Sequence, residues 1–277
     1  MFDVNDKQIV VIEAGAAGRQ YWRDLWRYRE LFYFLAWRDI AVRYKQTLIG
    51  VAWSLLRPLA TMIVFTLIFG AVANLPSHGA PYAVFVFAAL LPWQFFSSAL
   101  QESSNSLINN SNMISKVYFP RLVVPVSAVI VSLVDFMIAF AVLLVFLWWY
   151  HVVPDWRILT LPGFVVLVFG IAVGAGLWFS ALNVEYRDFR YIVPFVVQLG
   201  IFVSPVGFSS AIVPQQWQLL YALNPMVGVI DGFRWAIIPG QPISWLAVMF
   251  SVALAVGLFT SGIWYFRKME RHLADVI

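Results

Sequence analysis

The chain has 277 residues, of which 62% are hydrophobic and 12% are charged, and its formal net charge is +4. This composition leaves no room for a soluble domain of ordinary size, so the positive charge indicates contact with anionic lipid headgroups and gives no indication of nucleic-acid binding. The chain has no cysteine, and His78, His151 and His272 stand in separate segments, so we expect no disulfide, no thiol chemistry and no metal site.

Two segments precede the first long apolar block. Residues 1–27 are expected to be a cytoplasmic amino-terminal segment, because they lack the pattern of a removable signal peptide. Residues 28–48 are too charged to cross a membrane and predict an amphipathic helix in the inner interface, which is either a plain anchor or a docking surface. At 100° per residue its apolar face holds Phe34, Trp37, Ala41, Tyr44 and Leu48, with Asp39, Arg43 and Gln46 opposite.

Six apolar blocks follow within residues 49–277, each with about the 20 residues that a helix needs to cross a bilayer. Their expected limits are 51–73, 82–100, 122–150, 159–182, 191–213 and 243–266. When these blocks are threaded through a membrane, 16 of the 18 Lys and Arg residues fall on one side, counting Arg57 near the cytoplasmic start of the first block, and only Arg157 and Arg234 fall on the other. The positive-inside rule therefore predicts an all-α, six-span membrane protein with both termini in the cytoplasm.

The second span carries aromatic residues on one helical face. Phe85, Trp93 and Phe96 are spaced at i, i+8 and i+11, close to one stripe. Flat apolar rings with few fixed charges would suit the sliding of a sugar polymer, so these three residues are predicted to line a substrate channel. Packing against lipid or other helices is the alternative.

Two features inside the spans predict contacts between helices. Asp135 lies near the midpoint of the third span, where an unpaired carboxylate costs about 2.5–3.5 kcal/mol, so it should find a donor. No second acid or histidine completes a proton relay in the spans, and a hydrogen bond between helices is the expected role. Gly170 and Gly174 form a G-x-x-x-G pattern in the fourth span, which permits close helix packing, either within the chain or between subunits.

Three connections between spans stand out. Residues 109–121 and 183–190 are short, charged cytoplasmic segments that would suit the transmission of a push from a neighbouring subunit, although positive-inside charge alone would also produce them. On the outer side, Pro214 and the Asn224-Pro225 pair are start signals for two short helices, and Pro239-Gly240 is a stop signal. We expect a re-entrant or interfacial hairpin there, acting as an outer gate or as a lid over helix ends.

The chain contains no phosphate-binding loop of the form G-x-x-x-x-G-K-[ST], no nucleophile elbow and no paired carboxylates in a catalytic setting. It is therefore not expected to be an enzyme. Any nucleotide chemistry that drives it must reside on another polypeptide.

Three motifs together resemble a known family. They are RDIAVRYKQTLIGVAWSLLRPL at 38–59, NVEYRDFRYIVP at 183–194 and ALNPM at 222–226. With them the chain, from about residue 28 to its end, resembles the membrane subunit of type-2 ABC exporters of the polysaccharide-export branch, which includes O-antigen, teichoic acid and capsular polysaccharide permeases. The resemblance implies a homodimer in the bacterial inner membrane, bound to two ATPase subunits that hold the ATP and Mg²⁺, and a lipid-linked polysaccharide as cargo.

The resemblance also implies roles for individual residues. The residues expected to couple to the ATPase subunits are Arg38, Asp39, Arg43, Lys45, Lys116, Tyr118, Glu185, Arg187, Asp188 and Arg190. Those expected in a periplasmic gate are Trp217, Tyr221, Asn224, Pro225 and Phe233.

Export of a lipid-linked O-antigen is the leading hypothesis. A drug or small-molecule efflux permease of the same superfamily is the first alternative. An ATPase-independent channel or ion-coupled carrier, in which Asp135 would be critical, is the second.

Overall fold

The computed structural model describes residues 18–45, 48–117 and 119–270, and all regular structure in these ranges is helical. Five of the described helices are long and apolar enough to cross a membrane, and a sixth apolar helix is shorter. The predicted all-α membrane fold is therefore confirmed.

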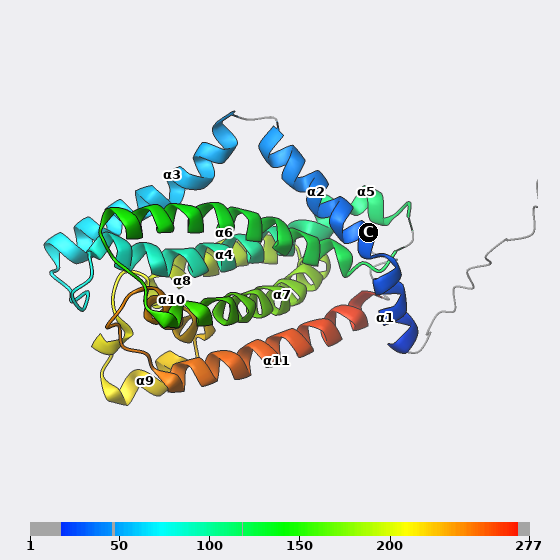
Figure 1. The fold of residues 1–277 in the computed structure, drawn as a ribbon. Helices are drawn as coiled ribbons and strands as arrows, with labels where there is room; N and C mark the ends of the chain where they lie inside the picture. The colour runs from blue at the N-terminus through cyan, green and yellow to red at the C-terminus, as the bar shows by residue number, and fades with distance from the viewer. Residues whose placement is uncertain (1–17, 46–47, 118, 271–277) are drawn as a thin grey trace, which may run out of the picture.

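The amino-terminal helices lie partly apart from the rest (Figure 1). Helix α1 spans Gly18–Arg27 and α2 spans Arg29–Lys45. Helix α3, Leu48–Phe65, continues as the π-helix η1, Thr66–Val72. Helices α2 and α3 form an inverted V whose apex points away from the other helices, and the lower part of α2 lies against α6.

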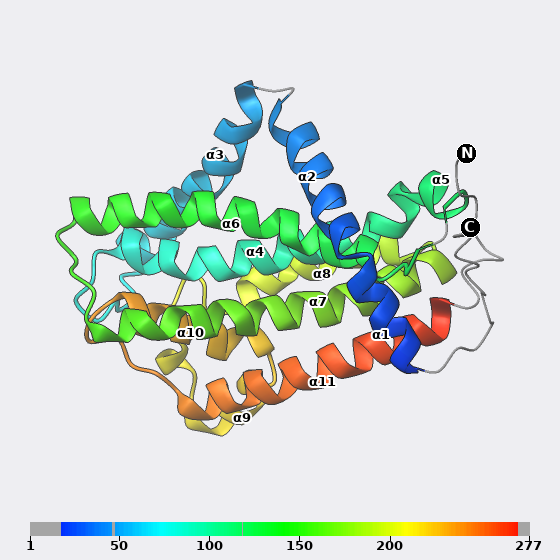
Figure 2. The ribbon, with the colours of Figure 1, turned by 45° about the vertical axis from the view of Figure 1, so that its right-hand side comes forward.

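The remaining helices form an elongated bundle (Figure 2). Their bounds are α4 Tyr82–Asn109, α5 Ser111–Ile114, α6 Val123–Trp149, η2 Trp156–Thr160, α7 Leu161–Glu185, α8 Phe189–Val203, η3 Ser210–Ile212, α9 Gln215–Ala222, α10 Pro225–Ile237 and α11 Trp245–Glu270. Helix α4 is the centre: 72% of its most apolar window is buried, against 22% for α11, and it packs on α6, α7 and α10. We call the end that carries α1 and α5 the inner end, and the end that carries α9 the outer end, following the predicted topology.

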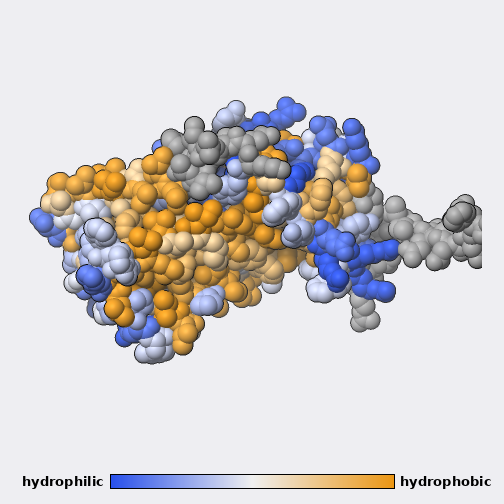
Figure 3. Space-filling model, turned by 45° about the horizontal axis from the view of Figure 1, so that its top comes forward, coloured by the Kyte–Doolittle hydropathy of each residue, from blue (hydrophilic) through white to orange (hydrophobic). Residues whose placement is uncertain are grey.

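The surface matches a protein that sits in a bilayer. Figure 3 shows a broad hydrophobic band across the middle of the molecule and hydrophilic residues gathered at its two ends. Exposed apolar side chains along α3, α8 and α11 contribute to this kind of surface, which would be unfavourable in water.

Helices α7 and α11 touch through their backbones at two glycines. A Cβ atom added to Gly174 would lie 2.5 Å from the carbonyl carbon of Leu258, and one added to Gly262 would lie 2.5 Å from the carbonyl oxygen of Gly174. The predicted close packing at Gly174 is confirmed. At Gly170, however, an added Cβ would meet nothing within 4 Å, so only half of the G-x-x-x-G pattern is used in this way.

The fifth predicted span ends earlier than expected. The sequence predicts a span over 191–213, but α8 stops at Val203, and its 15 residues cover only about 22 Å. Ser204 is extended (φ −92°, ψ 153°), because the following Pro205 disfavours helical backbone in the residue before it. The chain then runs as a buried irregular segment before η3. Helix α8 is therefore shorter than the predicted span because the helix breaks after Val203.

Candidate functional site

Helix α2 turns some of its aromatic side chains outward and two of its arginines toward the bundle. Phe34 and Trp37 are 62% and 59% exposed, whereas Leu35 is buried. Arg38 and Arg43 both reach partners on other helices. A helix on a water-soluble protein has the opposite arrangement, so this one is suited to contact with lipid.

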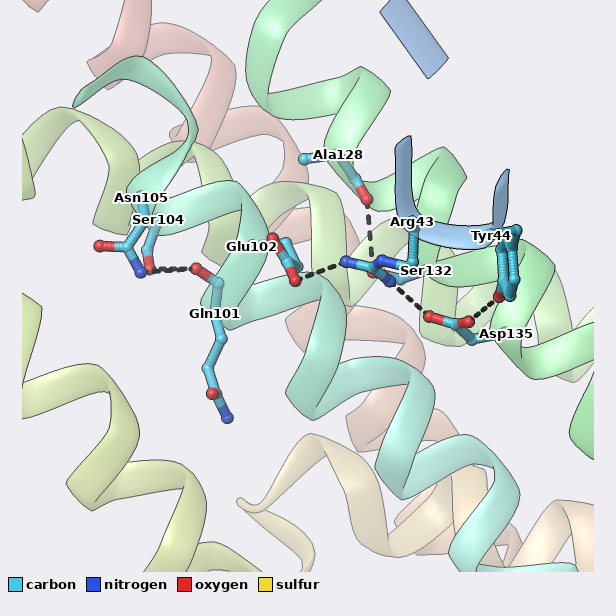
Figure 4. Close-up of polar contacts among 9 residues, drawn as sticks. All are labelled: Arg43, Tyr44, Gln101, Glu102, Ser104, Asn105, Ala128, Ser132 and Asp135. Carbon is cyan, nitrogen blue, oxygen red and sulfur yellow. Dashed lines mark hydrogen bonds and ion pairs between the residues drawn. The ribbon is translucent and has the colours of Figure 1, made fainter. Parts of the chain in front are cut away.

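Arg43 joins three helices in one cluster of charges (Figure 4). Its Nη1 donates to Asp135 Oδ2 on α6 at 2.6 Å, and its Nη2 donates to Glu102 Oε1 on α4 at 2.6 Å. The neighbouring Tyr44 hydroxyl donates to the other oxygen of Asp135. We call these four residues the inner joint. The expectation that Asp135 finds a donor on another helix is confirmed. The placement of Tyr44 on a face opposite Arg43 is wrong, because both side chains bond the same carboxylate.

The inner joint carries two negative charges and one positive charge. The side chain of Asp135 is 23% exposed and that of Glu102 is 46% exposed, so the two carboxylates that hold Arg43 differ in how far they are buried within the chain. A mid-span carboxylate is tolerated when it is paired, and Arg43 supplies the pairing charge here. The amphipathic helix is therefore anchored by the same acid that the membrane span would otherwise leave unpaired.

A second contact ties α2 to the inner end of α4. The Arg38 Nη2 donates to Asn110 Oδ1 at 2.9 Å, and its Nε donates to Asp39 Oδ1 at 2.8 Å. Asn110 lies at the junction between α4 and α5. Together with the Glu102 contact, this holds α2 at two points to the last turns of α4. Lys45 ends α2, and its side chain lies outside the described residues.

The first predicted coupling segment is an exposed tip between buried anchors. Ile114 and Phe119 are buried, while Lys116 and Val117 between them are exposed. The backbone N–H of Arg121 donates to the carboxylate of Glu270, at the end of α11, at 2.8 Å. Tyr118 lies outside the described residues. The tip is thus held at its base and presents Lys116 to its surroundings.

The second predicted coupling segment has the same construction. Asn183 is buried at its base and donates from Nδ2 to the backbone oxygen of Ser104 on α4 at 2.9 Å. Beyond it four charged residues are exposed: Glu185, Arg187, Asp188 and Arg190. A hydrogen bond to the Glu185 carboxylate and its negative charge raise the pKa of the Tyr186 hydroxyl. Both segments lie at the inner end (Figure 2).

The predicted channel rings are largely inside the chain. Phe85 and Trp93 are buried, the first beneath the guanidinium of Arg234 and the second against Gly200 of α8, where an added Cβ would lie 2.5 Å from the Trp93 Cη2. Phe96 is partly buried, 5.9 Å from the Trp93 ring. Two of the three rings therefore have packing roles in this conformation, and their contact with cargo stays a prediction.

The outer hairpin consists of α9 and α10, as the sequence predicts, but the two helices differ in burial. Trp217 on α9 is exposed, whereas Phe233 on α10 is buried against Phe136 and Phe164. Asn224 caps α10 by accepting from the backbone N–H of Met226 at 3.0 Å, with Pro225 in the first turn. Its Nδ2 also donates to Ser204 Oγ at 2.9 Å, which ties the cap to the end of α8.

The sequence reasoning missed the charged residues of α10. Asp231 and Arg234 are both buried, and Tyr221 of the preceding helix is partly buried beside them. Arg234 was counted only as an outer charge. An acid and a base at i, i+3 on an otherwise apolar short helix are costly to bury unless they are bonded, and that cost is the signal that could have identified them.

Comparison with known proteins identifies the family of the chain. The ABC-2 type transporter family matches residues 30–238. Two O-antigen export system permease proteins named RfbA are similar: that of Myxococcus xanthus is 29% identical over 76% of this chain and 82% of its own length, and one from Klebsiella pneumoniae is 28% identical over 87% and 92%. The polysialic acid transport protein KpsM of Escherichia coli is 25% identical over 80% and 88%. The chain is a multi-pass membrane protein that belongs to the ABC-2 type transporter family.

Proposed function

We propose that the chain is the permease subunit of an ABC exporter that moves lipid-linked polysaccharide, of the O-antigen kind, out across the bacterial cytoplasmic membrane. The observation that carries the proposal is the similarity to permeases named for O-antigen export over most of both chains, within a family matched over 30–238. The similarity to a polysialic acid transport protein supports a polysaccharide cargo more broadly.

The energy for export comes from a partner. The sequence has no phosphate-binding loop, so ATP and Mg²⁺ belong to a separate ATPase subunit. The two inner segments offer that subunit a docking surface, because each presents charged side chains from a base fixed by buried residues. A short, firmly anchored loop can transmit a displacement to the helices on both sides of it. A flexible loop would change its own conformation instead.

Movement would reach the membrane helices along α4 and α6. These helices flank the first segment, and the inner joint links both of them to α2. Arg38, Asp39 and Arg43 act inside the permease in this scheme, while Lys116, Glu185, Arg187, Asp188 and Arg190 meet the partner. Two copies of the permease and two ATPase subunits form the complex.

Deletion of the gene tests the cargo. A strain without the chain should accumulate lipid-linked polysaccharide in the cytoplasmic leaflet and lose the corresponding surface glycan, and the wild-type gene should restore both. Normal surface glycan in the deletion strain would contradict the proposal. Sensitivity to a toxic compound with unchanged glycan would favour drug efflux instead.

Charge reversal tests the docking surface. The double variant Arg187→Asp, Asp188→Arg should weaken co-purification of the ATPase subunit or separate ATP hydrolysis from export. The control is Arg157→Asp, which reverses an arginine of η2, at the opposite end of α7 from this loop. Unchanged association and coupling in the double variant would remove this loop from the scheme.

The orientation is tested with single cysteines, because the natural chain has none. With both termini in the cytoplasm, cysteines at positions 78 and 215 should react with an impermeant maleimide added to whole cells. Cysteines at positions 187 and 271 should react only after the cells are opened. The reverse pattern would overturn the proposed topology.

A further inference from the structure

The break after α8 is buried, although its backbone is irregular. Ser204, Pro205, Val206 and Gly207 are all buried, and no helix or strand hydrogen-bond ladder covers them. Irregular backbone at membrane depth is tolerated only where the protein itself satisfies its polar groups. The partners of these carbonyl groups are therefore the key to the stability of this segment.

Side chains from two other helices, α10 and α4, donate hydrogen bonds to these carbonyl oxygens. Three consecutive carbonyl oxygens are bonded: that of Val206 by Arg234 Nη2 at 2.8 Å, that of Gly207 by the Tyr82 hydroxyl at 2.6 Å, and that of Phe208 by Arg234 Nη1 at 2.8 Å. The remaining nitrogen of the guanidinium group, Arg234 Nε, donates to the carbonyl oxygen of Phe85 in the first turn of α4 at 3.1 Å. A single side chain thus links α10, α4 and the break.

The surroundings of Arg234 fit it closely. Its Cζ lies 3.6 Å from the centroid of the Phe85 ring, so the guanidinium is stacked as well as hydrogen-bonded. Asp231, one turn earlier on α10, accepts from the hydroxyl of Ser210 at 2.5 Å. Both charged residues of α10 therefore hold the same stretch, 206–210, and they balance each other's charge.

We infer that Arg234, with Tyr82, is a positioning residue that keeps the outer end of α8 closed to solvent; we call this set of bonds the carbonyl clamp. The planar fork of arginine bonds these three carbonyl oxygens from three separate nitrogen atoms, Nε, Nη1 and Nη2. The ammonium group of lysine is a compact point charge and cannot reach them together. The inference rests on the proposed function only in taking this end of the molecule as the outer one, where the cargo would leave.

Water access to the clamp can be measured directly in the purified full-length chain in detergent, which removes any dependence on orientation or on cargo. The reporter is Val206→Cys, at a side chain that is fully buried within the clamp while its carbonyl group is retained. A water-soluble maleimide should label this parent slowly. Adding Arg234→Lys should raise the labelling rate by about tenfold or more, because local opening then exposes the break.

Two further variants separate the clamp from general unfolding. Tyr82→Phe removes only the bond to Gly207 and should give a smaller rise in labelling. Arg157→Lys is a change of the same kind at another outer arginine, and it should leave the labelling rate of Val206→Cys unchanged. A Gln215→Cys reporter on exposed α9 should label equally in all backgrounds. Unchanged labelling of Val206→Cys in both Arg234→Lys and Tyr82→Phe would overturn the inference, whatever the cargo proves to be.

Discussion

The inner joint and the carbonyl clamp both use an arginine to connect three parts of the molecule, but their partners differ. Arg43 bonds the side chains of Asp135 and Glu102, which are partly exposed at the surface of the chain. Arg234 bonds backbone oxygens and is buried. Side-chain partners can rotate and be exchanged for water, whereas backbone partners move only with their segments. The inner contact is therefore suited to rearrangement, and the outer one to holding a shape.

The largest expected effect is at the outer end. Arg234→Gln removes the charge beside Asp231 and leaves carbonyl groups unbonded, so the free energy of unfolding should fall by about 3–5 kcal/mol. Denaturant titration of the purified chain in detergent measures this loss. Arg157→Gln is the control and should cost far less. Equal losses for the two arginines would mean that burial of Arg234 in the clamp has no special weight.

The second largest effect is expected when the inner joint is broken at Asp135, its less exposed acid. Asp135→Asn keeps the shape of the side chain but removes the charge that holds Arg43 and Tyr44, and it should cost about 2 kcal/mol of unfolding free energy. A double-mutant cycle with Arg43→Gln should show coupling between the two changes. Additive losses would indicate that the ion pair contributes little.

The more exposed acid should matter less. Glu102→Gln should lower the unfolding free energy by less than about 1 kcal/mol, because its carboxylate is 46% exposed and the ion pair is screened. Raising the salt concentration should shrink the difference further. A loss as large as that of Asp135→Asn would contradict the assigned order within the joint.

The smallest effect on stability is expected at Asn110→Ala, which removes the acceptor of Arg38 and a donor to the backbone oxygen of Ser106 at a partly exposed site. The cost should be about 0.5 kcal/mol, near the low end for a hydrogen bond. Export should nevertheless decline per ATP hydrolysed if this contact keeps α2 and α4 together, and assays on the permease with its ATPase subunits would detect that. Ser115→Ala, on the exposed part of the same connection, is the control.

Patterns along the chain predicted much of the fold because the bilayer imposes them. Charge asymmetry and block length predicted the helices, and Asn224 and Pro225 predicted the start of α10. The break after Val203 was missed because residues 204–213 are nearly as apolar as the helix before them, so composition hides the effect of Pro205. A tertiary contact must satisfy the freed carbonyl groups, and no local pattern reveals one.

The candidate site was only partly predictable for the same reason. Asp135 could be recognised because a charge in a span demands a partner, but the partner's identity depends on how α2 crosses α6. Tyr44 was misplaced because an aromatic ring suits an apolar face while its hydroxyl also bonds an acid. Phe85 and Trp93 share a helical face as expected, yet the neighbours that cover them, Arg234 and Gly200, come from distant parts of the sequence.

The direct contact between Gly174 and Gly262 has a practical consequence for watching the transporter work. Because the backbones of α7 and α11 are in direct contact there, we expect α11 to move together with α7, the helix that leads into the loop at 186–190. A fluorophore attached at Lys268 would then report the displacement of that loop during each cycle of ATP hydrolysis, without altering any residue in it.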